Sequence, residues 1–271
     1  MSGTLYVVAT PIGNLADASP RSIEILRAAD IVACEDTRTS RTLLARHGIA
    51  ARTAALHAHN ERAATEKLLR ALRDGQDVAL VSDAGTPGIS DPGALLVAAA
   101  HGEGLRVVPV PGPNAAVAAY SAAGFVADRF LFAGFLPARG DKDLDAFDGP
   151  WPVIFYEAPH RVLETVKALL ERFGPDRELA IARELSKKFE EIARMRLADA
   201  PGWLGAGPHR QQGEFVLVLG PGEQRRSPVD AERVLRVLLA ALPAAEAAKL
   251  AAKITGVPRK ELYAAALRRP K

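Results

Sequence analysis

Short apolar runs alternate with longer amphipathic segments along the first half of the chain. The runs have the length of β-strands and lie at 5–9, 30–34, 52–57, 78–81 and 105–110. Between them, apolar residues recur at the three- and four-residue spacing of a helix. Ser19 before Pro20 and Asp91 before Pro92 are expected N-caps, each with proline at the first helical position. Strands that alternate with helices in this way predict a mainly parallel sheet covered on both faces.

The second half keeps the alternation with shorter connections. Strands are expected at 130–134, 153–156, 178–182, 191–197 and 214–219, with a helix at 159–173. The short connections indicate mixed strand directions, so this half is predicted to be α+β. The segment 136–150, rich in Gly, Pro, Asp and Lys, is expected to be a mobile surface loop.

The last part of the chain is helical in pattern and basic in charge. A near capping box at 227–230 precedes apolar residues at helical spacing. The layout of a helix-turn-helix follows, with helices expected at 244–254 and 258–267 and a turn at 255–257. From residue 244 onward two acidic residues stand against seven basic ones, which are Lys249, Lys253, Arg259, Lys260, Arg268, Arg269 and Lys271. This charge predicts either a nucleic-acid surface or an ordinary solvated face. The predicted domains are 1–124, 125–222 and 223–271.

Composition narrows the class of protein. The 271 residues are 48% hydrophobic and 25% charged, with no apolar run near the ~20 residues of a membrane span. No signal-peptide pattern precedes the first strand, so a soluble cytoplasmic protein without membrane partners is expected. The single cysteine, Cys34, excludes an internal disulfide and is interpreted as a small buried hydrophobe. The histidines are scattered, and no metal-ligand spacing is present. A net charge of +3 permits nucleic-acid binding.

The loop at 82–93 carries the strongest local signal. Its sequence, SDAGTPGISDPG, follows the buried strand 78–81 at once and combines a carboxylate with small and turn-forming residues. In open α/β sheets ligands bind outside the carboxyl ends of the strands, where backbone groups remain free. The loops at 10–14 and 110–114 also follow strands and are also rich in turn-forming residues. A ligand site is therefore predicted where the three loops meet.

Six motifs stand in one order along the chain. They are Thr10-Pro11-Ile12-Gly13-Asn14-Leu15, Glu35-Asp36-Thr37-Arg38, 82–93, 110–114, 155–161 and 182–187. Together they closely resemble the small-subunit ribosomal RNA 2′-O-methyltransferases that modify a decoding-centre cytidine, within the tetrapyrrole methylase superfamily. The resemblance covers essentially the whole chain. It implies a two-domain class III methyltransferase fold with a C-terminal helix-turn-helix, S-adenosylmethionine in the cleft between the domains, a homodimer, and small-subunit ribosomal RNA in the assembled subunit as substrate.

The resemblance also assigns the donor site. The matching positions are Pro11, Ser82, Asp83, Ala84, Gly85, Thr86, Asn114, Ala115, Phe155 and Tyr156. These residue types suit the ligand, because a sulfonium with an amino-acid tail needs a carboxylate for its ammonium and free N–H groups for its carboxylate. Asp83 and the turn at 84–86 can offer both. Adenine needs an apolar slot, which small residues such as Ala115 allow.

The acceptor hydroxyl must lose a proton as it attacks the methyl carbon, so a base or a cation that lowers its pKa is expected. Candidates in the motifs are Glu35, Asp36, Arg38, Arg161, Lys187 and Glu190. Asp36 or Lys187 is the preferred base. Each has a structural alternative: Glu35 and Asp36 can cap the helix that follows, and Arg161 can pair with Glu157. The predicted RNA contacts are Arg161, Lys249, Lys253, Arg259 and Lys260.

Two other functions fit the same pattern. A tetrapyrrole or corrin C-methyltransferase would be favoured by a glycine-rich first loop, whereas this chain has Thr-Pro-Ile-Gly at 10–13. A non-catalytic RNA-binding assembly factor is disfavoured because Asp83 and the small residues around it are retained. The linker at 139–143 balances its charges where these enzymes are usually basic, and Ser186 stands where threonine is usual.

Overall fold

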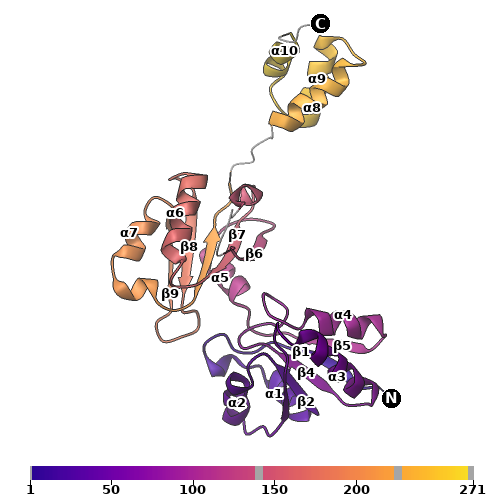
Figure 1. Cartoon of the computed structure of the whole chain (residues 1–271). Coiled ribbons are helices and arrows are strands. Elements are labelled where there is room, and N and C mark those ends of the chain that lie inside the picture. The colour runs from indigo at the N-terminus through magenta and orange to yellow at the C-terminus, as the bar shows by residue number, and fades with distance from the viewer. Residues whose placement is uncertain (1, 138–142, 223–227, 268–271) are drawn as a thin grey trace. The chain divides into compact units, whose positions relative to one another are not determined.

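The computed structural model describes residues 2–137, 143–222 and 228–267, with only the backbone described at 228–230. The chain divides into two compact units, Met1–Pro221 and Gly222–Lys271 (Figure 1). The first unit contains two five-stranded sheets, and the second is entirely helical in its described part.

The first sheet is parallel throughout, as predicted. Its order is β3-β2-β4-β1-β5. The strands are β1 (Thr4–Val8), β2 (Ile31–Cys34), β3 (Arg52–Ala55), β4 (Val78–Val81) and β5 (Arg106–Val110). The helices between them are α1 (Pro20–Ala28), α2 (Thr37–Arg46), α3 (Glu61–Arg73) and α4 (Ala94–Gly102). A short 3-10 helix, η1 (Leu15–Asp17), follows β1.

Alternation along the strands builds a core on each face of this sheet. Leu5, Ile31 and Leu80 face α3 and α4, whereas Val32 and Cys34 face α1 and α2. Figure 1 shows these helix pairs on opposite sides of the sheet. The predicted burial of Cys34 is confirmed.

The second sheet mixes directions, also as predicted, with the order β6-β7-β10-β8-β9. Only β6 and β7 pair in parallel. The strands are β6 (Leu131–Phe135), β7 (Val153–Glu157), β8 (Glu178–Arg183), β9 (Glu191–Arg196) and β10 (Phe215–Leu219). α6 (Val162–Phe173) and α7 (Ala200–Gly205) cover one face, and α5 (Ala115–Ala123) covers the other. The helix that follows the last strand of the first sheet therefore packs on the second sheet.

Two local expectations differ from the structure. Asp91 does not cap a helix, because α4 begins at Ala94 after Gly93, whose φ is +123°. A carboxylate from α3 serves instead: Glu61 accepts from the backbone N–H of Gly93 at 2.7 Å and of Leu95 at 3.3 Å. A side chain on Gly93 would also collide with Leu80, 2.8 Å from the nearest carbon.

The segment 136–150 is not simply a surface loop. Residues 138–142 lie outside the described part, but η2 (Leu144–Phe147) follows them. Leu144 and Phe147 pack on the core under α6, and Arg172 pairs with Asp145. The two apolar side chains three residues apart explain this docking, since they fall on one face of a helical turn.

The second unit has the predicted helix-turn-helix. Its helices are α8 (Pro228–Leu239), α9 (Ala244–Thr255) and α10 (Arg259–Leu267). Alanines 247, 248 and 251 let the helices approach closely, and Gly256 ends α9 in the left-handed conformation with φ of +67°. The predicted capping box at 227–230 lies outside the described side chains. No helix in the described residues is long and apolar enough to cross a membrane.

Candidate active site

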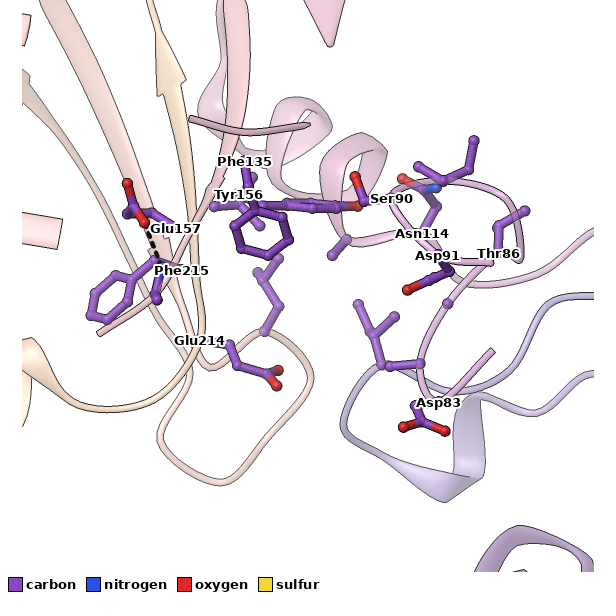
Figure 2. A pocket seen from close by; sticks show the side chains of 18 of the residues that line it. Asp83, Thr86, Ser90, Asp91, Asn114, Phe135, Tyr156, Glu157, Glu214 and Phe215 are labelled. Carbon is purple, nitrogen blue, oxygen red and sulfur yellow. Dashed lines mark hydrogen bonds between the residues drawn. The ribbon is translucent and has the colours of Figure 1, made fainter. Parts of the chain in front are cut away.

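A pocket of about 350 Å³ lies in the first unit, at the carboxyl ends of the parallel strands. Its volume is within the range of pockets that hold small ligands. One wall comes from the loops after β1, β4 and β5, and the other comes from β7, the start of β10 and the loop after β8 (Figure 2). The pocket is therefore where the sequence predicted a ligand site.

Hydrogen bonds between the loops fix the first wall. The backbones of Thr10 and Gly85 bond to each other in both directions, at 2.8 and 3.1 Å. The Thr10 hydroxyl donates to the Ser82 carbonyl at 3.2 Å, and the Thr86 hydroxyl donates to the Pro113 carbonyl at 3.1 Å. Three loops from separate strands are thereby held as one surface, with backbone groups available to a ligand.

Aromatic side chains form the opposite wall. The Tyr156 hydroxyl accepts from the backbone N–H of Ala116 at 3.3 Å, which ties β7 to the start of α5. Phe135 packs edge-on against Tyr156 with ring centroids 5.5 Å apart, and 55% of Phe135 remains exposed. Figure 2 shows both rings between the strands and the loops. Such an exposed aromatic surface suits a flat apolar ligand group.

The lining of the pocket is acidic. Four of its lining residues are acidic, Asp83, Asp91, Glu157 and Glu214, and none is Lys, Arg or His, but the Glu157 side chain is only 1% exposed and does not face the cavity. Two of the four are already paired, Glu157 with Arg161 and Glu214 with Lys187. Asp83 and Asp91 have no cationic partner among the described residues. The pocket therefore attracts a cation, and Figure 2 shows Asp83 and Glu214 on opposite walls.

Sequence reasoning missed Asp91 as a site residue, because it was assigned to a helix cap. In the structure Asp91 lines the pocket, and half-burial together with the nearby Glu35 carboxylate raises its pKa to about 6. Burial also raises the pKa of Glu35, with Asp83 adding to the effect. The position of Asp91 in the sequence could have indicated this role, because Asp91 lies on the same ligand-facing loop as Asp83. Ile12, Phe135 and Glu214 also line the pocket without having been predicted.

The ten predicted donor residues fall into three groups. Seven line the pocket: Asp83, Ala84, Gly85, Thr86, Asn114, Ala115 and Tyr156. Pro11 and Ser82 instead line an adjacent hollow of about 280 Å³, and the buried Ser82 hydroxyl bonds the carbonyls of Ala84 and Gly85. Phe155 is fully buried in the core on the other face of β7, since neighbouring strand residues point to opposite faces. Its side chain does not reach the pocket.

Asp36 serves as the N-cap of α2, the structural alternative offered by the sequence. Its carboxylate accepts from the backbone N–H of Arg38 at 2.8 Å and pairs with the Arg38 guanidinium at 2.6 Å. The Arg38 side chain is the main cause that lowers the pKa of Asp36 to about 2. A carboxylate this acidic is a weak base at neutral pH. The backbone N–H of Asp36 donates to Asp83 at 3.0 Å, so the motif also positions the pocket's carboxylate.

Lys187 is held between two carboxylates. Its ammonium lies 2.9 Å from Glu184 and 2.9 Å from Glu214. Partial burial lowers the pKa of Lys187, but the hydrogen bonds to the two glutamates outweigh this and raise it above the usual value. Lys187 is therefore charged at neutral pH. It can stabilise a developing oxyanion, and it cannot act as the base in that state.

The predicted RNA contacts also differ in their surroundings. Arg161 forms the ion pair with Glu157 that was its structural alternative, with Nε 2.7 Å from the carboxylate, and it also donates to the Leu136 carbonyl at 3.1 Å. Lys249, Lys253, Arg259 and Lys260 are exposed on α9 and α10. Their role in binding RNA stays a prediction.

The affinity of the pocket for a cationic ligand is expected to fall as the pH drops through 6. Asp91 has a pKa of about 6, so it is charged at pH 7 and neutral at pH 5. Losing one charge beside a cationic ligand weakens binding by about 1 kcal/mol, or roughly fivefold. Calorimetry between pH 5 and 7 with S-adenosylmethionine, the ligand that the resemblance implies, measures this. Asp91→Asn should flatten the profile, and a variant that keeps the full step would contradict the assignment.

Comparisons with known proteins find similarity along nearly the whole chain. Residues 4–201 match the family model of tetrapyrrole (corrin/porphyrin) methylases, and residues 226–270 match that of the RsmI C-terminal HTH domain. A curated protein of Pseudomonas aeruginosa, "Ribosomal RNA small subunit methyltransferase I", is 50% identical, over 99% of this chain and 98% of its own. The protein of the same name from Escherichia coli O157:H7 is 46% identical, over 98% and 95%.

Among solved structures, the chain resembles a uroporphyrin-III C-methyl transferase from Thermus thermophilus complexed with S-adenosyl homocysteine. The TM-score is 0.57 at 21% identity, over 80% of this chain and 97% of that one. At this identity the likeness shows the fold.

Proposed function

This chain belongs to the tetrapyrrole methylase family and is an S-adenosylmethionine-dependent methyltransferase, and we propose that it methylates the ribose 2′-hydroxyl of a cytidine in the decoding region of small-subunit ribosomal RNA. The relatives that share nearly the full length carry the name of a small-subunit ribosomal RNA methyltransferase. The observation that carries the proposal is the acidic pocket at the carboxyl ends of the parallel strands, next to a hollow whose lining includes the cations Arg46, Lys187 and Lys188.

The residues of the pocket fit the donor. Asp83 would hold the ammonium, and the backbone N–H groups of Ala84 and Thr86 would hold the carboxylate. Ala115, Phe135 and Tyr156 form an apolar surface for the adenosine. Asp91 adds a charge that complements the sulfonium. When bound, S-adenosylmethionine supplies an electrophilic methyl group, and the chain's own residues then act on the acceptor.

Activation of the acceptor hydroxyl is assigned to the cation rather than to Asp36. Lys187 lies on the loop after β8, whose residue Leu185 lines the donor pocket. A fixed positive charge beside the ribose hydroxyl lowers its pKa, so that the proton passes more readily to solvent water, and stabilises the alkoxide oxygen that takes the methyl group from the donor sulfur. Asp36, with a pKa of about 2, is committed to capping α2 and to Arg38.

Lys187→Met is therefore expected to lower kcat about tenfold and to leave the donor Kd unchanged. Lys187→Arg keeps the charge and should recover much of the rate. If Lys187 acted as the base instead, the Lys187→Arg variant would be inactive. The rate of the wild-type enzyme would then rise steeply at high pH. Single-turnover rates from pH 6 to 10, with calorimetry for the donor, measure the difference.

The finer parts of the proposal rest on the family resemblance. We propose the assembled small subunit as substrate, a cytoplasmic location and a homodimer. Exposed apolar side chains on α5 and the loop that follows it support self-association: Val117, Val126 and Phe130 are 53%, 99% and 41% exposed. Light scattering of the purified chain tests the dimer.

The proposed function is tested by offering alternative acceptors. Labelled S-adenosylmethionine is incubated with the protein and with small ribosomal subunits from a strain lacking this gene, with protein-free ribosomal RNA, or with a tetrapyrrole. Label on the subunits supports the proposal. Label on the tetrapyrrole would favour the C-methyltransferase alternative, and donor binding absent altogether would favour a non-catalytic assembly factor.

A further inference from the structure

A second hollow, beside the candidate active site, has a lining of the opposite charge. It measures about 730 Å³ and is lined by Gly13, Asn14, Leu15, Ala16, Arg46, His47, Ser186, Lys187 and Lys188. Three of these residues are cationic and none is acidic, whereas the donor pocket has four acidic residues and no cation. We propose that this hollow binds a backbone phosphate of the RNA strand that carries the methylated nucleotide. The proposal rests on the proposed function and names a subsite for its substrate.

The hollow adjoins the donor pocket through two loops that line both. Ile12 and Leu185 line the pocket, and the next residues, Gly13 and Ser186, line the hollow. The loops touch: a Cβ on Gly13 would lie 2.8 Å from the Leu185 carbonyl oxygen, and the Ser186 hydroxyl donates to Asp17 at 2.6 Å. A phosphate in the hollow would therefore keep its attached ribose close to the donor.

Two cations in the hollow are available to an anion. Lys187 is occupied by Glu184 and Glu214, but Arg46 and Lys188 are exposed and form no ion pair among the described residues. His47 also lines the hollow, and its Nε2 atom is buried without a hydrogen-bond partner. A guanidinium and an ammonium that converge on one hollow are the groups that proteins use for phosphate.

An exposed aromatic ring beside the hollow points to a nucleic-acid strand as the source of the phosphate. Phe189 is 63% exposed, and the Lys188 ammonium lies 5.5 Å from its ring centroid. Single-stranded RNA is bound by such combinations of a cation and a ring on which a base can stack. Arg183 donates to the Phe189 carbonyl at 3.1 Å, and Glu190 accepts from the Ser186 backbone at 2.6 Å, so the loop is held in place.

The test compares binding of small ribosomal subunits, from a strain lacking the gene, to variants of the full chain. Removing the two cations that hold the phosphate, in Arg46→Gln/Lys188→Gln, should weaken binding about tenfold and make the slope of log K against log salt shallower by about 0.7. Phe189→Ala should weaken binding by a similar factor without changing the slope, because stacking releases no counterions. Lys67→Gln, an exposed lysine on α3 outside both hollows, is the matched control.

Donor affinity, measured by calorimetry, should stay at the wild-type value in all of these variants. A wild-type salt slope in the double variant, or an equal loss of affinity in Lys67→Gln, would overturn the subsite. The proposed function would still stand if the wild-type protein binds the subunits and transfers methyl to them. A wild-type protein that does not bind the subunits at all would overturn both. If inorganic phosphate competed with the subunits as strongly as RNA does, the hollow would be a site for a free anion and not for an RNA strand. That result would contradict the proposal.

Discussion

Asp83→Asn should raise the Kd for S-adenosylmethionine about thirtyfold. Asp83 is one of two pocket carboxylates without a cationic partner among the described residues, so it is available for the donor's ammonium. A charge-assisted hydrogen bond of this kind contributes about 2 kcal/mol. Asparagine keeps an oxygen that can accept from the Asp36 backbone N–H, as Asp83 does at 3.0 Å. The substitution therefore removes the charge while the loop keeps its anchor.

Calorimetry with the donor measures this loss, and thermal unfolding checks that the fold is intact. Asp74→Asn is the matched control, because Asp74 is an exposed carboxylate at the end of α3, away from the pocket. An unchanged Kd in Asp83→Asn would remove Asp83 from the donor site. An equal change in the control would reduce the effect to net charge.

Arg161→Met should destabilise the protein by about 3 to 5 kcal/mol and lower the Tm by roughly 10 °C. The Glu157 side chain is only 1% exposed and the Arg161 side chain 18%, with Nη2 2.5 Å from the carboxylate. The substitution would leave the Glu157 carboxylate buried without its cation. The remaining bonds, from Thr165 at 2.6 Å and from the Ala158 N–H at 2.7 Å, do not neutralise the charge.

The double variant Glu157→Gln/Arg161→Met should recover a large part of the stability, because no uncompensated charge remains. Denaturant unfolding of the single and double variants measures this. The same proteins decide between the two interpretations of Arg161 that the sequence left open. A fully stable Arg161→Met that had lost RNA affinity would make it an RNA contact.

The strands and the ligand-facing loops could be predicted because their signals are local. Val78–Val81 is apolar at every position and stops at Ser82-Asp83, and this is enough to place the loop at the end of a buried strand. The role of Asp91 depended on a distant residue. Glu61, on α3, occupies the backbone N–H groups that an N-cap would have satisfied, and this leaves Asp91 to face the pocket.

Two other differences concern which face a residue occupies. Phe155 and Tyr156 are both apolar enough for either side of a sheet that is buried on both faces, so sequence alone did not show that only Tyr156 reaches the pocket. α5 is a run of small residues with no distinct apolar stripe, and nothing in it indicates that it packs on the second sheet. The ion pairs that neighbouring charges form with Asp36 and Lys187 likewise depend on the folded structure and could not be predicted from the sequence.

The acidic pocket and the basic hollow are proposed to act together in delivering a methyl group to a ribose of small-subunit ribosomal RNA. The experiment that addresses this at once is transfer of labelled methyl from S-adenosylmethionine to small subunits from a strain lacking this gene, followed by nuclease mapping and mass spectrometry of the labelled nucleotide. We expect a single 2′-O-methylated cytidine in the decoding region. Label on a base, on another region of the RNA or on no RNA would refute the proposal.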